Sequence, residues 1–265
     1  MKNKWTVVPY LIWMAVFTVI PLGMVAYYAF TQNGEFSLQA FLDITVYAPV
    51  FLKSLYLALI ATLICLIIAY PMAFIMSRAR PVVQKTMQML IMLPMWMNFL
   101  LRIYSWVTLL EKDGLIENIL GFFGIHTTLI YTSGAVVLGM VYNFLPYMLM
   151  PIYTVMTKID DNLLEAASDL GSGTVRKFTK VIIPLSLPGV VSGITMVFVP
   201  AASTFLIAQY LGGSNNMLIG DIIEKEFLRD YSVGSALSLV LMIVMFIFIG
   251  ITNKFGEDDM EGMLI

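Results

Sequence analysis

The stretch EAASDLGSGTVRKFTKVIIP, residues 165–184, carries regularly spaced charge in a chain whose long flanking segments are apolar. Asn162 and Glu165 have the spacing of a capping box, which predicts a helix that begins near residue 162. Gly171 supplies the left-handed conformation that commonly ends a helix, and Thr174 is a typical cap for a second helix. We therefore predict a hairpin of two short helices that lies in water beside a membrane.

The composition of the rest of the chain identifies an integral membrane protein. Of its 265 residues 60% are hydrophobic and only 12% are charged, with a mean hydropathy of +0.88, which excludes an ordinary soluble domain. The single cysteine, Cys65, lies within an apolar run and has no second cysteine with which to form an intrachain disulfide. We expect Cys65 to pack as a small apolar side chain.

Six apolar runs are long enough to cross a bilayer as helices. They cover about residues 7–30, 54–76, 86–110, 132–156, 185–206 and 233–251. No internal repeat and no low-complexity linker divides the chain. We therefore predict an all-α fold, a single transmembrane domain over residues 1–265, in which the hairpin at 160–184 connects the fourth and fifth spans.

Basic residues concentrate in alternate connections, and this bias predicts the orientation. They occur at the amino terminus, between the second and third spans and in the hairpin, namely Lys2, Lys4, Arg78, Arg80, Lys85, Lys158, Arg176, Lys177 and Lys180. Both termini and the hairpin are thus expected on the cytoplasmic side of the cell membrane. The opposite connections are rich in acidic residues, among them Asp221, Glu224, Glu226 and Asp230.

The chain lacks the common signatures of catalysis. It has no HExxH, no CxxC, no GxxxxGK[ST] phosphate loop, and its one histidine, His126, falls in an outer connection. We predict no enzyme activity, no metal and no cofactor in this chain, and no nucleic-acid partner. No acidic residue lies in the interior of a predicted span, which weakens the hypothesis of an ion-coupled carrier without eliminating it.

Polar and aromatic side chains in the third and fourth spans are candidates for a substrate path. Asn98, Arg102 and Trp106 are four residues apart and are predicted to share one helix face. Arg102 either turns inward to a partner or to the path, or extends towards the outer headgroups. Aromatic rings attract ammonium groups, and the same rings also serve as interfacial anchors or pack against lipid. The candidates on these spans are Trp96, Asn98, Arg102, Tyr104, Trp106, Tyr142, Asn143 and Tyr147.

The hairpin resembles the EAA loop of ABC importer permeases. In that family the loop reads Glu-Ala-Ala, three residues, Gly, nine residues, then Ile-x-Leu-Pro. The matching residues are Glu165, Ala166, Ala167, Gly171 and Pro184, while Val181 and Ile183 replace the family's Ile and Leu. The resemblance implies that this loop couples the membrane domain to an ATPase carried by another subunit.

Further segments narrow the resemblance to permeases of the spermidine/putrescine (PotB) type. They are PMWMNFLLRIYSW, YNFLPYMLMPIY, LEAASDLG, IIPLSLPGVVSG and LGGSNNMLIGDII. The resemblance implies a six-span permease of the type I importer fold and transport of polyamines into the cytoplasm. Permeases for sulfate, molybdate or iron share the EAA loop and remain alternatives, and neither spermidine nor putrescine is favoured.

The same resemblance implies the partners of the chain. They are a homologous PotC-type permease, two PotA-type subunits that bind ATP and Mg, and an external PotD-type polyamine-binding protein. The acidic outer residues Asp221, Glu224, Glu226 and Asp230 are then candidates for contact with the binding protein. A plain solvated loop explains these charges equally well.

Overall fold

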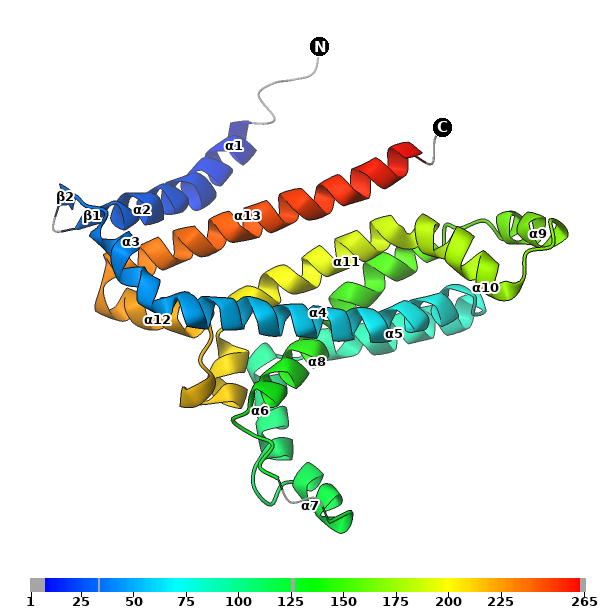
Figure 1. The fold of residues 1–265 in the computed structure, drawn as a ribbon, viewed down its shortest axis with the longest axis horizontal. Helices are drawn as coiled ribbons and strands as arrows, with labels where there is room; N and C mark the ends of the chain where they lie inside the picture. The colour runs from blue at the N-terminus through cyan, green and yellow to red at the C-terminus, as the bar shows by residue number, and fades with distance from the viewer. Residues whose placement is uncertain (1–7, 33, 125–126, 263–265) are drawn as a thin grey trace.

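The computed structural model describes residues 8–32, 34–124 and 127–262, and the described chain is almost entirely helical (Figure 1). One small antiparallel hairpin joins β1 (Thr31–Gln32) to β2 (Glu35–Phe36). Lys2, Lys4 and His126, which entered the predictions, lie outside the described residues.

Five helical segments of the described chain are long and apolar enough to cross a membrane. They are Val8–Ala29, Gln39–Ser77, Ser133–Met156, Thr174–Ser203 and Tyr231–Lys254, and they correspond to the first, second, fourth, fifth and sixth predicted spans. The first comprises α1 (Val8–Met14), a π-helical turn η2 (Ala15–Val19) and α2 (Ile20–Ala29). The second comprises α3 (Gln39–Asp43), η3 (Ile44–Tyr47) and α4 (Ala48–Ser77), while the fourth is α8 (Ser133–Met156) and the sixth belongs to α13 (Tyr231–Gly262).

The third predicted span is not one straight helix, so the prediction of a continuous helix over 86–110 is wrong. The first part is α5 (Pro81–Trp96). The second part begins with α6 (Phe99–Leu110), which leads through a turn into α7 (Leu115–Phe122). The bend between α5 and this second part is 90°. Asn98 is the N-terminal cap of α6, because its side-chain oxygen accepts a hydrogen bond from the Leu100 N–H at 2.9 Å. An asparagine in an apolar run was therefore a cap.

The fifth span begins inside the hairpin. After α9 (Asp161–Asp169), one unbroken helix passes through α10 (Thr174–Lys177), the π-helical turn η4 (Phe178–Ile182) and α11 (Ile183–Ser203). The chain then forms the short turns η5 (Ala208–Gly212) and η6 (Ser214–Asn216) and helix α12 (Ile219–Arg229) before it enters α13. The predicted second helix of the hairpin thus does not stop at Pro184.

Small side chains allow the central helices α4, α8 and α11 to pack closely against one another. The buried face of α4 carries a fully buried residue every three or four positions, namely Ala58, Ala61, Cys65, Ala69 and Ala73. This confirms that Cys65 packs as a small apolar residue. On α11, a side chain at Gly193 would meet Met148 of α8, because a Cβ there would lie 2.8 Å from the Met148 sulfur.

The connections gather at two opposite ends of the molecule (Figure 1). The turn between α4 and α5, the α9–α10 hairpin and the end of α13 lie at one end. The β1–β2 hairpin, α7 and α12 lie away from that end. This arrangement agrees with the predicted alternation of basic and acidic connections.

Candidate functional site

The predicted hairpin is present, and its first helix begins earlier than the capping-box spacing indicated. The side chain of Asp160 accepts a hydrogen bond from the Asn162 N–H at 3.0 Å, so Asp160 is the cap of α9. The expectation that Asn162 and Glu165 form the cap is wrong. Asp and Asn cap helices about equally well. Asp160 is the cap because its backbone is extended and the helix begins at the next residue.

The turn of the hairpin depends on Gly171, as the sequence predicted. Gly171 has a φ of +74°, in the left-handed region, and the N–H of Ser172 donates to the Ala167 carbonyl at 3.0 Å. Gly173, with an ordinary φ of −67°, precedes α10. Thr174 is therefore the first residue of that helix and not its cap, which corrects the prediction.

The hairpin exposes an apolar surface beside a carboxylate. Glu165 and Ala166 are exposed, and Leu170 is 86% exposed although it is a large apolar residue. Leu163 and Val175 are exposed as well. Exposed apolar patches with a polar rim mark surfaces that bind other proteins. The sequence analysis did not single out these apolar residues, although Leu170 directly precedes the glycine turn.

The second half of the hairpin is tied firmly to the central helices. The Phe178 ring packs edge-on against Tyr70 and Phe74 of α4, with centroid distances of 5.9 and 5.6 Å. Tyr70 also forms a hydrogen bond of 2.8 Å with Ser186 of α11, two residues beyond Pro184. Helix α10 continues into α11, so the second half of the hairpin and the fifth span are one continuous helix.

Arg102 is half-buried in the short helix α6. Its guanidinium carbon lies 5.5 Å from the centre of the Phe99 ring, and its Nε is buried without a hydrogen-bond partner. Among the described residues no carboxylate forms an ion pair with it. Arg102 and Trp106 lie four residues apart within α6 and so share a helix face, while Asn98 is the cap of that helix.

The aromatic candidates separate into pairs. Trp106 meets Tyr142 at 5.4 Å between ring centres, and Tyr104 meets Tyr210 at 5.0 Å. Trp96, at the end of α5, is 76% exposed. The structure therefore brings Trp106 and Tyr142 together and does not join all the predicted residues in one lining.

Two candidates on α8, Asn143 and Tyr147, are one helical turn apart but differ in exposure. Asn143 is buried, and its side-chain nitrogen donates to the Gly139 carbonyl at 2.8 Å while its side-chain oxygen has no partner. Tyr147 is 43% exposed and lines a groove.

Two of the four acidic outer residues are buried, so the expectation that they present charge on an outer surface is wrong for them. Glu226 accepts a hydrogen bond from the Tyr47 hydroxyl at 2.9 Å, and Asp221 accepts one from the Leu218 N–H at 2.7 Å. Asp230 accepts one from the Ser232 N–H at 2.8 Å at the start of α13. Of the four acidic residues only Glu224 is exposed.

The environment of Asp221 changes its acidity. Burial raises the pKa of Asp221 from 3.8 to about 6, against the opposing effects of the Leu218 N–H and of Lys225. A buried aspartate at a helix start is consistent with a capping role that holds α12 in place.

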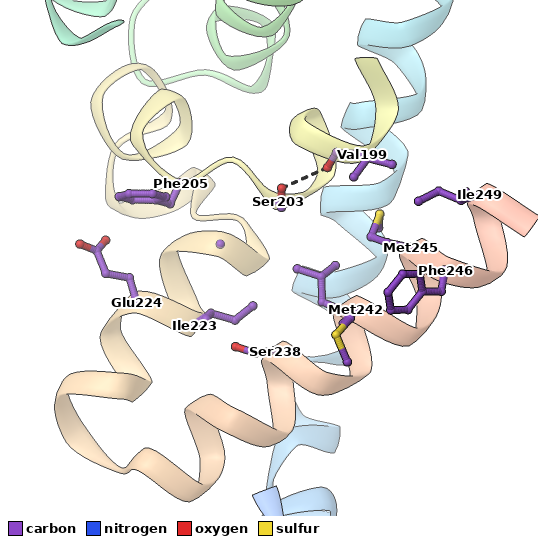
Figure 2. A pocket seen from close by; sticks show the side chains of 12 residues that line it. Val199, Ser203, Phe205, Ile223, Glu224, Ser238, Met242, Met245, Phe246 and Ile249 are labelled. Carbon is purple, nitrogen blue, oxygen red and sulfur yellow. Dashed lines mark hydrogen bonds between the residues drawn. The ribbon is translucent and has the colours of Figure 1, made fainter. Parts of the chain in front are cut away.

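Several grooves open between the spans, and two of them have linings that bear on transport. The outer groove has a volume of about 540 Å³ and lies between α11, α12 and α13. Figure 2 shows Glu224 beside Phe205 on one side of it, and Met242 and Met245 of α13 on the other. The central groove, of about 610 Å³, lies between α5, α8 and α11, and Tyr147 belongs to its lining.

Comparisons with known proteins place the chain among membrane permeases. The model of the family described as "Binding-protein-dependent transport system inner membrane component" matches residues 5–255. The spermidine/putrescine transport system permease protein PotB of Haemophilus influenzae is 38% identical over 262 residues, covering 93% of this chain and 91% of that protein. The protein of the same name from Escherichia coli is 36% identical over 247 residues, covering 88% and 90%.

Solved structures of bacterial transporters share the fold. A chain of an ABC transporter involved in the import of the acidic polysaccharide alginate superposes with a TM-score of 0.77 at 15% identity, covering 97% of this chain and 96% of that one. A chain of the MetNI methionine ABC transporter in an inward-facing conformation gives 0.64 at 14% identity, covering 82% and 97%. At these identities the likeness concerns the fold alone.

Proposed function

This chain belongs to the family of binding-protein-dependent transport system inner membrane components, and from that membership we propose that it is the permease subunit of an ATP-driven importer of polyamines. The observation that carries the choice of substrate is the identity of 36–38%, over nearly the whole chain, to permeases named for spermidine/putrescine transport. The chain is a non-catalytic membrane subunit. Its family membership also argues against the ion-coupled carrier.

The coupling role falls to the hairpin. We assign contact with the ATPase to Glu165, Ala166, Ala167 and Gly171, with Pro184 at the junction to the fifth span. The exposure of Glu165 and the apolar Leu170 supports this assignment, because both are available to a partner. The continuous helix from Thr174 to Ser203 would carry a movement of the hairpin to the outer end of the span.

The remaining partners and the orientation follow from the same proposal. A homologous PotC-type permease would complete the path, two PotA-type ATPases with bound ATP and Mg would dock at the hairpin, and a PotD-type protein would deliver the polyamine. The hairpin and both termini would face the cytoplasm. Of the acidic residues, exposed Glu224 remains the candidate for contact with the binding protein.

The test is ATP hydrolysis by the reconstituted complex with loaded binding protein. We expect spermidine or putrescine to stimulate hydrolysis and sulfate to have no effect, and Glu165→Ala to abolish the stimulation while the complex still inserts. Asp169→Ala is the matched control, because Asp169 is an exposed acidic residue one turn further along the same helix.

The outcomes separate the parts of the proposal. Stimulation by sulfate alone would retain the coupling hairpin and overturn the polyamine. Unchanged stimulation in Glu165→Ala would overturn the role of the carboxylate. The absence of any associated ATPase would contradict the importer.

A further inference from the structure

The central groove between α5, α8 and α11 has an unusual lining for a membrane protein cavity. No charged side chain lines it, and its apolar wall includes four methionines, Met92, Met95, Met150 and Met196. Its polar side chains are Tyr147, Thr154 and Ser192. Three prolines, Pro146, Pro151 and Pro188, also line the groove.

These prolines change the hydrogen bonding of the backbone on the groove side. Proline has no N–H, so the carbonyl four residues earlier lacks its usual helical donor. Pro146, Pro151 and Pro188 lie inside helices, and they therefore release the carbonyls of Tyr142, Tyr147 and Pro184. In a helix such a carbonyl points towards the residue four positions later, so it lies beside the ring of the proline that lines the groove.

A ligand for this groove needs hydrogen-bond donors, positive charge and an apolar body. Carbonyl oxygens replace the hydration shell of cations in membrane proteins without introducing a buried carboxylate. Methionine side chains adapt to flexible apolar surfaces such as a methylene chain. An anion would find carbonyl oxygens and no cationic side chain here, which disfavours anionic substrates.

We propose that the central groove binds an aliphatic polyammonium ion, with its ammonium groups on the carbonyls released by Pro146, Pro151 and Pro188 and its methylene groups against the methionines. The inference rests on the proposed polyamine transport and gives that function a site.

The outer groove is the rival location, because the Glu224 carboxylate lines it (Figure 2). No proline is among its lining residues, but Ser203 there is the last residue of α11, so carbonyls at that helix end approach the groove beside Gly220. The hydroxyls of Ser203 and Ser238 there donate to the carbonyls of Val199 and Gly234 in their own helices, at 3.1 and 2.9 Å. The outer groove thus offers one carboxylate and the carbonyls at the end of one helix, whereas the central groove has proline-released carbonyls on two helices, α8 and α11.

The experiment uses single cysteines in the assembled complex. Cys65 is the only cysteine of this chain, so Cys65→Ala removes its native thiol, and the complex with Cys65→Ala alone gives the background labelling of the other subunits. Ser192→Cys places a thiol in the central groove, and Ser238→Cys is the matched control in the outer groove, because both serines are half-buried. Each variant reacts with a cationic and with an anionic methanethiosulfonate, and both rates are divided by those of a free thiol in solution.

We expect the cationic reagent to modify Ser192→Cys about tenfold faster than the anionic one, and spermidine to slow that reaction. Spermidine should leave the modification of Ser238→Cys unchanged. Equal rates for the two reagents without protection at Ser192→Cys would overturn the inference, and so would protection at Ser238→Cys alone. Polyamine uptake by the unmodified complex is measured first, because its absence refutes the proposed function and not the site.

A second pair of variants tests the carbonyls themselves. Pro151→Ala restores the N–H that satisfies the Tyr147 carbonyl, and helix propensity makes the change favourable for folding. We expect a raised KM for polyamine uptake. Pro71→Ala restores a hydrogen bond in α4 at an exposed position outside the groove and should leave KM unchanged. An equal effect of both substitutions would show that helix bending, and not the carbonyl, matters.

Discussion

At the scale of single residues, Gly171 is the position whose conformation the hairpin requires. An alanine there is strained by roughly 1 kcal/mol, because φ is +74°, although nothing within 4 Å obstructs a side chain. Gly171→Ala is expected to lower substrate-stimulated ATP hydrolysis with little loss of thermal stability, measured on the purified complex. Gly171→Asn should restore part of the activity, since asparagine tolerates this conformation.

Gly173→Ala provides the control for that prediction. Gly173 also has open space around it, but its φ is −67°. If Gly173→Ala impaired hydrolysis as much as Gly171→Ala, the left-handed conformation would not be the reason.

Arg102 is a half-buried cation whose Nε is buried, and its guanidinium lies against a ring and has no carboxylate partner among the described residues. We expect Arg102→Met to lower polyamine uptake about tenfold while ATP hydrolysis in the absence of substrate stays unchanged, because an intramembrane charge is costly and is retained for function. Lys112→Met, at an exposed position after α6, is the control. Uptake at the wild-type rate in Arg102→Met would indicate a residue that extends to the headgroups.

Asp221 predicts a pH dependence of stability. Its pKa is about 6 in the folded protein and 3.8 in the unfolded chain, so the folded state binds the proton more tightly. The contribution of Asp221 to the free energy of unfolding is then greatest below pH 3.8. It is lost as the pH rises towards 6, by roughly 3 kcal/mol in total. Asp221→Asn removes this dependence. The thermal stability of Asp221→Asn relative to the wild type should rise between pH 4 and pH 6 and stay constant above pH 6. A difference in stability that is the same at all pH values would contradict the assignment of the raised pKa to Asp221.

At the scale of elements, the hairpin and the fifth span form one mechanical unit. Phe178 anchors this unit to α4 through its contacts with Tyr70 and Phe74. Phe178→Ala should therefore uncouple the two activities, so that ATP hydrolysis continues while polyamine uptake per ATP falls, because the contact that transmits the movement is lost. Parallel measurement of uptake and phosphate release checks this.

Thr179→Ala is the control for the element prediction, because Thr179 directly follows Phe178 on the same helical run but is exposed. Loss of hydrolysis and uptake in equal proportion in Phe178→Ala would indicate impaired docking of the ATPase instead.

At the scale of the whole molecule, the two ends should lie in different compartments. Leu170 at the hairpin is 86% exposed and Phe36 in the β1–β2 hairpin is 77% exposed. In the Cys65→Ala background, a membrane-impermeant maleimide should label Phe36→Cys in intact cells and Leu170→Cys only after permeabilisation. The reverse pattern would invert the proposed orientation.

The sequence by itself determined the features that depend on local composition. Apolar runs predicted where the spans lie, with the third span as the exception in shape, because helices in lipid satisfy their own backbone hydrogen bonds. Gly171 predicted the left-handed turn, because few other residues adopt that conformation without strain. Basic residues in alternate connections predicted which connections share an end.

Only the tertiary structure decided which polar residues are surface and which are interior. Glu226 is buried by Tyr47, a residue 179 positions away in the chain, and no local pattern contains that contact. The break at Asn98 depends on a choice between helix continuation and capping, which the surrounding packing settles. The groove of prolines and methionines likewise exists because α5, α8 and α11 meet, and their meeting depends on contacts between residues that are far apart in the sequence.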